Sequence, residues 1–302
     1  MGEGLMPNAP ASYATRRYNP MTGCEKGLPC WDRCWARGFA TRHRGRFGYP
    51  KSDPFRPTFH PDRLDEPLRW KGRQVAAVSF MGDIGAPGVK DEWLCALWAV
   101  MALTPQHRYL ILTKRPARLA SWLMDPNTYD GVLRVAEAIR WGNEKLQLTM
   151  FGISNPATAP LRNVWIGTSF SNQEEYDLRR PELDGVPAAH RWLSYEPATG
   201  PVDFGVLHCC KDDPMPINWT TMGCESGPKR RPFDQAWARA TRDQCAAAGI
   251  PWYYKQGTKG YCTDPDKSCP VDCERQTCSL PVVKKPLLDG VRHASVPWEA
   301  KP

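Results

Sequence analysis

Short apolar runs alternate with helical patterns from residue 75 onward, and this alternation limits the possible folds more than any other feature. Each run is rich in β-branched and aromatic residues, as buried strands are. Alternating strands and helices predict a parallel sheet with helices packed outside it. The runs cover residues 75–83, 109–114, 164–169, 191–196, 217–225 and 251–255.

A polar or charged side chain closes each of these runs. The carboxyl ends of the strands in a parallel barrel surround one mouth, where such folds keep their chemistry. A solvated strand end would explain any one of these residues, but six in the same position favour convergence on one mouth. We therefore expect an α/β fold of the (β/α)8 TIM-barrel type, complete or partly open, rather than a doubly wound sheet. The closing residues are Asp83, Lys114, Ser169, Glu196, Glu225 and Lys255.

The domain organisation follows from the same rhythm. Helical patterns at 89–105 and 233–249 separate strands, and the rhythm is interrupted by a longer segment. We expect a single domain over residues 1–302 with an insertion at about 125–161. The sequence has neither a signal-peptide pattern nor a stretch of about 18 apolar residues that could cross a bilayer. These observations predict a cytoplasmic protein without a membrane partner.

Three cysteines lie close together in "CEKGLPCWDRC", and we call Cys24, Cys30 and Cys34 the cysteine trio. Disulfides are rare in a reducing cytosol, so clustered thiols there usually bind metal or take part in catalysis. Three thiolate ligands would leave one iron of a four-iron cluster open to the amino and carboxylate groups of S-adenosylmethionine. Zinc would need a fourth ligand, which His43 or His60 could supply. A trio that binds no metal is the third interpretation.

A second cysteine group predicts another metal site near the C-terminus. Four thiols within seventeen residues suit a closed structural zinc site or an auxiliary iron–sulfur cluster. A surface loop of free thiols is the alternative. This C-terminal knuckle consists of Cys262, Cys269, Cys273 and Cys278.

The charge distribution favours contact with phosphates. The chain has 40 Lys and Arg against 32 Asp and Glu, a formal charge of +8. "RHRGRFGYP" at 42–50 and "KRRPFDQAW" at 229–237 mix cations with aromatic rings, which suits phosphates and unstacked bases. A solvated basic face is the alternative. We expect a nucleic acid, DNA in the first place, or a nucleotide as the partner.

Several motifs together resemble one family of phage and bacterial proteins. The chain is similar to the gp-thirty-seven/gp-sixty-eight family from residue 18 to residue 298. This resemblance implies a barrel related to radical S-adenosylmethionine enzymes. Within the family, the tyrosine of "SYEP" stands where cysteine is common. The motifs are "YNPMTGC", "HPDRLDEPLRWK", "FMGDI", "TPQHRYLILTKRP", "NVWIGTSFSNQ", "SYEPATGPVD", "GCESGPKRRPFD", "RDQCAAAGIPWYYKQ" and "PLLDG".

The first functional hypothesis is a radical enzyme that modifies a nucleic-acid base or nucleotide. The cysteine trio would hold a [4Fe–4S] cluster that reduces S-adenosylmethionine. Glu196 and Glu225 would then hold the methionine amino group or ribose hydroxyls, and Lys114, Arg115 and Lys255 would meet carboxylate or phosphate oxygens. The full set of predicted cofactor-binding residues is Ser169, Arg115 and Glu196.

Two other hypotheses remain open at this stage. In a guanine transglycosylase that inserts a 7-deazaguanine into DNA, Asp83 would be the nucleophile and Glu196 or Glu225 the acid and base, with structural zinc. In a non-catalytic, metal-stapled module, the basic surface would only bind nucleic acid or a partner protein. The carboxylates expected at the mouth speak against this last reading, since a phosphate-binding groove has little use for them.

Overall fold

The computed structural model describes residues 13–141, 155–207, 216–226, 230–258, 282–284 and 286–298. Its centre is a sheet whose strand order follows the chain except at two short strands that pair elsewhere. In this order the sheet contains β1 (Arg16–Tyr18), β4 (Val75–Val78), β5 (Arg108–Thr113), β6 (Val164–Phe170), β7 (His190–Tyr195), β8 (Ile217–Gly223), β9 (Trp252–Thr258) and β10 (Val282–Lys284).

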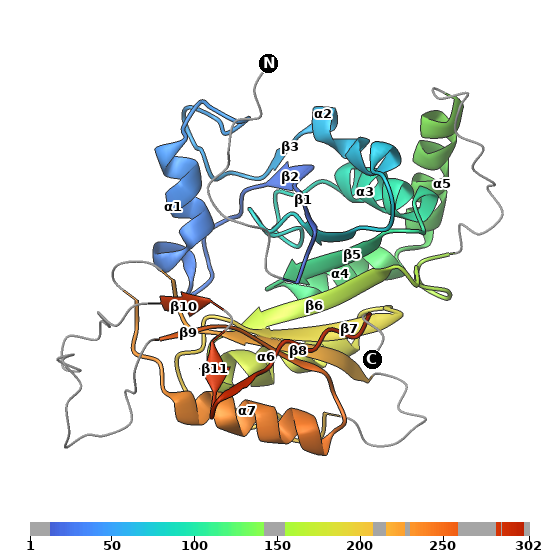
Figure 1. Cartoon of the computed structure of the whole chain (residues 1–302). Helices are drawn as coiled ribbons and strands as arrows, with labels where there is room; N and C mark the ends of the chain where they lie inside the picture. The colour runs from blue at the N-terminus through green and yellow to red at the C-terminus, as the bar shows by residue number, and fades with distance from the viewer. Residues whose placement is uncertain are drawn as a thin grey trace.

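The sheet is curled and open. Neighbouring strands from β1 to β9 are all parallel, and β10 is antiparallel to β9. In a barrel, the strands follow one another around the sheet in chain order. In a doubly wound sheet, the strand order reverses at a switch point. The order seen here is that of a barrel. Within the described part of the chain, however, no pairing joins β1 to β10, so the sheet forms a half-barrel (Figure 1). The predicted α/β class is confirmed, and a closed barrel is not shown.

The helices lie between successive strands, as the sequence predicts. The two predicted helices are present as α3 and α7, and Gly249 after α7 has a φ of +68°, a left-handed conformation that favours glycine. The helices are α1 (Trp35–Arg42), α2 (Pro61–Leu64), α3 (Asp91–Leu103), α4 (Pro116–Met124), α5 (Pro126–Trp141), α6 (Gln173–Asp184) and α7 (Gln235–Ala247).

The remaining elements are short. Residues 31–33 and 66–69 form the 3-10 helices η1 (Trp31–Arg33) and η2 (Glu66–Arg69). Two small antiparallel sheets pair β2 (Met21–Thr22) with β3 (Thr58–Phe59), and β11 (Leu287–Leu288) with β12 (Val291–Arg292). Much of the segment expected as an insertion is α5, which packs against α3.

The sheet carries a different core on each face because successive strand side chains point to opposite sides. One face packs against the helices through residues such as Ile111, Leu193 and Tyr254. The other face carries a layer of large rings, with Trp192 and Trp219 stacked at 5.1 Å between ring centroids. This aromatic layer fills the interior of the half-barrel below the carboxyl ends of the strands.

The aromatic layer depends on a glycine in β6. A Cβ on Gly167 would lie 2.6 Å from the indole of Trp192, so only glycine leaves room for this ring. Trp192 Nε1 donates a hydrogen bond of 3.0 Å to the carbonyl of Ile111, which satisfies its buried N–H. The sequence "VWIGTS" therefore folds with its glycine facing the interior of the half-barrel.

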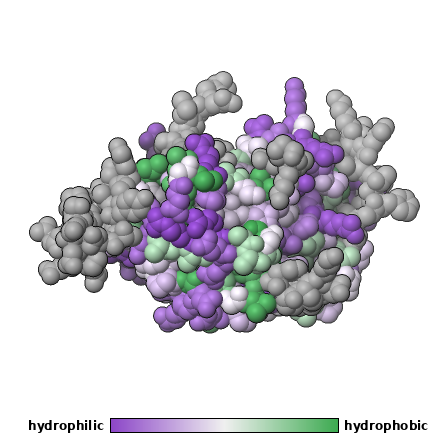
Figure 2. Space-filling view, turned by 60° about the horizontal axis from the view of Figure 1, so that its bottom comes forward, coloured by the Kyte–Doolittle hydropathy of each residue, from purple (hydrophilic) through white to green (hydrophobic). Residues whose placement is uncertain are grey.

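The outer surface near α6 and α7 is mainly polar. Figure 2 brings this side, the bottom of Figure 1, toward the viewer and shows hydrophobic residues in separate small groups among hydrophilic ones. Leu178 of α6 and Leu287 are among the exposed large hydrophobic residues. This is the surface expected of helices that bury one side against a sheet.

Candidate functional site at the carboxyl ends of the strands

The loop that carries the cysteine trio is docked onto the loop after β4. Gly23 N donates to the carbonyl of Met81 and Asp83 N donates to the carbonyl of Gly23, each over 3.0 Å. Gly23 and Gly82 form a parallel bridge, and a Cβ on Gly82 would lie 2.3 Å from the carbonyl oxygen of Gly23. Two glycines thus allow the backbones to meet, which places Cys24 beside Asp83.

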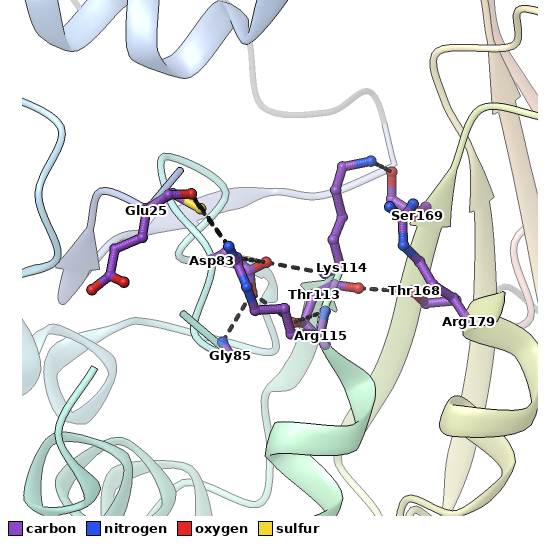
Figure 3. A network of polar contacts seen from close by, with 10 residues as sticks. Glu25, Asp83, Gly85, Thr113, Lys114, Arg115, Thr168, Ser169 and Arg179 are labelled. Atoms are coloured by element: carbon purple, nitrogen blue, oxygen red, sulfur yellow. Dashed lines mark hydrogen bonds and ion pairs between the residues drawn. The ribbon is translucent and has the colours of Figure 1, made fainter. Parts of the chain in front are cut away.

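Asp83 is buried and saturated with hydrogen bonds. Its Oδ1 accepts from Gly85 N at 2.9 Å and from Thr113 Oγ1 at 2.5 Å. Its Oδ2 accepts from Lys114 N and from Arg115 Nη1, both at 3.1 Å (Figure 3). Two acceptor positions on each carboxylate oxygen are therefore used. This geometry supports a positioning role for Asp83 and gives no support to its use as a nucleophile.

Arg115 links this carboxylate to the cysteine trio. Its Nη1 lies 3.3 Å from the sulfur of Cys24, and its Nη2 donates to the carbonyl of Glu25 over 3.2 Å. Burial and the Asp83 charge raise the pKa of the Cys24 thiol, and Arg115 acts in the opposite direction. The cation therefore offers the charge that a thiolate at this position needs.

Cys30 and Cys34 flank η1 on the same loop. Both are free, partly buried thiols, and Cys34 is the N-cap residue of α1. Burial raises the pKa of Cys34, whereas the positive charge of Lys114 lowers it. Burial lowers the pKa of Lys114, and Cys30 opposes that shift. Cys30 and Cys34 therefore interact electrostatically with Lys114, which follows β5.

The cysteine trio offers the type of ligand, thiolate sulfur, that soft metal centres bind. Iron–sulfur clusters are held by cysteine thiolates, and here three thiols lie on one loop, with the cations Arg115 and Lys114 near Cys24 and Cys30 respectively. Across the residues that the structure describes, no group of three His, Cys, Asp or Glu side chains is placed to hold one ion. A cluster would therefore be held by Cys24, Cys30 and Cys34 only after their sulfurs drew together.

The two histidines considered as a fourth zinc ligand have other surroundings. His60 is buried, and its Nε2 lies 2.8 Å from Thr22 Oγ1. The ring of His43 packs on Phe39, with 4.3 Å between ring centroids. In the described part of the chain neither histidine joins the thiols in a metal-binding group. The C-terminal knuckle, with Cys262, Cys269, Cys273 and Cys278, lies outside the described residues.

The predicted polar residues form a continuous chain of contacts, although not all of them close a strand as expected. Lys255 lies inside β9, and Asp83 lies in the loop after β4. Lys114 Nζ donates to Ser169 Oγ, and Ser169 Oγ donates to the carbonyl of Glu196, each over 2.9 Å. Lys255 Nζ donates to Glu196 Oε1 over 2.6 Å. Figure 3 shows the Lys114 side chain crossing toward Ser169. Together with Asp83, which accepts from Lys114 N, these residues join β4 to β9 across one mouth. We call them the rim.

The carboxylates of Glu196 and Glu225 differ in how many of their oxygens can still accept a hydrogen bond from a ligand. Arg231 donates to Glu225 Oε2 from its backbone N over 2.7 Å and from Nη2 to Oε1 over 3.0 Å. Among the described residues Glu225 has no hydrogen bond to the rim. Glu196 Oε2 accepts no hydrogen bond from the part of the chain that the structure describes, although Oε1 is held by Lys255. Glu196 is therefore the rim carboxylate able to receive a ligand.

Two residues of α6 support the rim without having been predicted. Arg179 Nη1 donates to the carbonyl of Ser169 over 2.7 Å and to Glu175 Oε2 over 2.9 Å. Burial would raise the pKa of Glu175, but Lys114 and Arg179 hold it below its usual value. An acid and a base four positions apart, directly after a strand, are a signal that could have identified this pair.

β10 adds a second unpredicted group. Lys284 Nζ contacts Gln256 Oε1, and Gln256 Nε2 donates to the carbonyl of Cys224 over 2.6 Å. Burial and the neighbouring Lys255 lower the pKa of Lys284. An antiparallel edge strand lies outside the alternation of strands and helices, so no pattern in the sequence predicts this lysine.

The fold and the rim define an α/β protein with a half-barrel sheet and a charged mouth at the carboxyl ends of its strands. A model of the family described as "Protein of unknown function (DUF5131)" matches residues 8–297, and the chain belongs to this family. The comparisons found no matching curated protein and no matching solved structure. None of the described helices has the length and apolar character to cross a bilayer.

Proposed function

We propose that this chain is an iron–sulfur enzyme that cleaves S-adenosylmethionine to modify a nucleic-acid base or a nucleotide. The open sheet would be a partial (β/α)8 barrel. The chain would be a member of the phage-type family that its motifs resemble. The proposal includes a cytoplasmic location. It rests first on the contact between the cysteine trio and the rim through Arg115, which touches both Cys24 and Asp83.

That contact matters because it holds Cys24 at the end of the sheet where parallel barrels carry out chemistry. When bound, a four-iron cluster would supply an electron to the sulfonium of S-adenosylmethionine, which releases methionine and a carbon radical. The cysteine trio would hold the cluster. Arg115, which contacts Cys24, and Lys114, which interacts electrostatically with Cys30, would balance its negative charge.

The rim residues would bind and orient the rest of the cofactor. Glu196 Oε2, which has acceptor capacity left, would receive the methionine ammonium group or a ribose hydroxyl. Lys114 and Lys255 would meet carboxylate or phosphate oxygens. The ring layer around Trp192 would exclude water from below the reacting groups, which protects a reactive radical. Ser169 would hold Lys114 in place through its hydroxyl.

Base exchange with an Asp83 nucleophile receives less support. A nucleophilic carboxylate needs a free oxygen facing its substrate, and both oxygens of Asp83 already accept two hydrogen bonds each. A purely binding module would not require the buried Arg115 and Asp83 pair under its thiols. Zinc at the C-terminal knuckle is compatible with the proposal, because a structural zinc site can coexist with an iron–sulfur centre.

The proposal is tested by anaerobic reconstitution with iron and sulfide. We expect a brown protein that binds about four iron and four sulfide per trio and, with reductant, converts S-adenosylmethionine to methionine and 5′-deoxyadenosine. The triple variant C24A/C30A/C34A should lose this iron and the cleavage. The variant C262A/C269A/C273A/C278A separates the two sites, because it keeps the trio. A colourless wild-type protein that carries only zinc would end the proposal.

A further inference from the structure

A cavity of about 560 Å³ lies beside the cysteine trio, on the side of α1. Its size is within the range of small-molecule sites. The cysteine loop, η1, α1 and the segment 53–57 line it, and Cys24 reaches its wall. The cavity contains more positive than negative side chains. Its cations are Lys26, Arg37, Arg44 and Arg56, and its carboxylates are Glu25 and Asp53.

Most of these cations are not neutralised by the protein. Among the described residues, the side chains of Lys26, Arg44 and Arg56 form no hydrogen bond or ion pair, and all three residues are exposed. Asp53 Oδ1 instead accepts from Phe55 N over 3.3 Å. Three unpaired cations around one concave surface attract a multiply charged anion such as a phosphate.

Aromatic rings form one wall of the same cavity. Arg37 lies over the ring of Trp31, with its guanidinium carbon 5.0 Å from the ring centroid, and Phe55 packs against that ring at 5.8 Å. Trp31 Nε1 is buried and has no acceptor among the described residues. A buried N–H requires an acceptor, and none of the residues that the structure describes supplies it to Trp31. Rings beside cations are the arrangement that holds an unstacked base next to its phosphate.

We propose that this cavity binds the phosphate and base of a nucleotide, with Arg44 and Arg56 on the phosphate and the wall of Trp31 against the base. The ligand is a free nucleotide or one unit of a single strand, and both share this chemistry. The inference deepens the proposed function and rests on it for one point, that the bound nucleotide lies beside Cys24 because it is the substrate. An acidic peptide would use the cations but not the aromatic wall.

The test measures binding of fluorescent single-stranded DNA and RNA oligonucleotides to the full chain by anisotropy, over a range of salt concentrations. The variant R44Q/R56Q removes two cations of the cavity. The matched control R134Q/R140Q removes the same charge from exposed positions on α5, which does not line the cavity. W31F keeps a six-membered aromatic ring at this position and removes the five-membered part of the indole with its N–H. Competition by a nucleoside monophosphate, by the nucleoside and by inorganic phosphate identifies the recognised groups.

We expect R44Q/R56Q to bind the strand at least about tenfold more weakly than R134Q/R140Q, because each lost contact is charge-assisted. Its slope of log affinity against log salt should fall in magnitude by about 0.7, since one neutralised phosphate on a single strand contributes about 0.7 and both arginines contact the same phosphate. A smaller loss is expected for W31F. Equal binding by the two double variants would overturn the proposal, as would competition by inorganic phosphate as strong as that by the nucleotide.

The competition also distinguishes the two sources of the ligand. Oligonucleotide binding far tighter than that of the monophosphate would assign a single strand, and equal affinity per nucleotide would assign a free nucleotide. Cleavage of S-adenosylmethionine by the wild-type chain is measured in parallel. Cleavage without cavity-dependent nucleotide binding removes this inference alone. Cavity-dependent binding without cleavage removes the proposed radical chemistry and leaves the nucleotide site standing.

Discussion

Arg115 Nη1 lies 3.3 Å from the sulfur of Cys24, although 91 positions separate the two residues in the chain. The same nitrogen lies 3.1 Å from Asp83 Oδ2, so one cation serves a thiol and a carboxylate together. An arginine that is charged at all working pH values fixes the electrostatics at this point. The contact couples the cysteine loop to the strand ends, and four predictions test what this coupling and its neighbours do.

Replacing Asp83 with asparagine should destabilise the fold strongly. The change leaves the mostly buried Arg115 without its counter-charge. It also replaces one carboxylate oxygen, which accepts hydrogen bonds, with an amide NH2 group, which donates them. Breaking a buried ion pair costs about 3–5 kcal/mol of unfolding free energy. Urea unfolding of D83N and wild-type protein measures the loss.

The matched control for D83N is D65N, which removes the carboxylate of the exposed pair between Asp65 and Arg69. Exposed pairs contribute less than about 1 kcal/mol. If D83N and D65N unfold at the same urea concentration, the Asp83 carboxylate does not have the positioning role described above.

Replacing Gly82 with alanine should loosen the cysteine loop. The added Cβ would lie 2.3 Å from the carbonyl oxygen of Gly23, and backbone cannot move as freely as a side chain. Overpacking of this kind costs about 1–3 kcal/mol. Cys24 should also react faster with a thiol reagent, because its loop separates from Asp83. Peptide mass spectrometry after timed labelling gives the rate at Cys24.

Gly200 is the control for this substitution. A Cβ there would meet Asn172 Cβ at 3.6 Å, an ordinary contact, and neither Gly82 nor Gly200 has a left-handed backbone. G200A should change stability by no more than about 0.5 kcal/mol. Unchanged Cys24 labelling in G82A would contradict the docking of the loop through the glycine pair.

Acidification should destabilise the wild-type chain partly through His60. Burial, together with the positive charge of Arg63, lowers the pKa of His60 to about 4. The folded state therefore binds fewer protons than the unfolded state between about pH 4 and the ordinary histidine value of about 6.5. The stability that neutral His60 provides is complete above this range and is lost as the pH falls through it.

The variant H60Q isolates this effect, because glutamine can still contact Thr22 and does not titrate. Urea unfolding of both proteins at several pH values gives the difference in unfolding free energy between them. This difference should shrink from about pH 7 to about pH 5. A difference that stays constant over that interval would show that His60 does not titrate with a lowered pKa.

Replacing Glu196 with glutamine should weaken binding of S-adenosylmethionine. The change removes the charge that pairs with Lys255 and that would receive an ammonium group. Losing a hydrogen bond to a charged group costs about 1.5–3 kcal/mol, a factor of roughly 10 to 100 in affinity. Calorimetric titration of reconstituted protein measures the affinity.

E225Q provides the comparison, since Arg231 occupies the Glu225 carboxylate. E225Q should lose stability and retain most of the affinity for S-adenosylmethionine. If E225Q lost more affinity than E196Q, the roles of the two glutamates assigned from their hydrogen bonds would have to be exchanged.

The sequence by itself determined the alternation of parallel strands and helices and the end of the sheet at which the polar residues gather. Apolar runs with Lys114, Ser169, Glu196 and Lys255 at or near their carboxyl ends were enough, because strand periodicity is a local property and parallel strands bring these ends to one edge. The helices α3 and α7 followed from their apolar patterns and end signals in the same way. The cysteine trio was visible for the same reason, since its members are close in sequence.

Only the tertiary structure decided how these residues are paired. That Asp83 is saturated, that Glu225 belongs to Arg231 and that Glu196 keeps an oxygen depends on contacts between segments far apart in the chain. It also decided that the sheet stays open in the described residues, with an antiparallel β10 at its edge. The physical reason is that hydrogen-bond partners and sheet closure depend on packing across the whole fold. Short stretches of sequence do not show which distant segments will pack together.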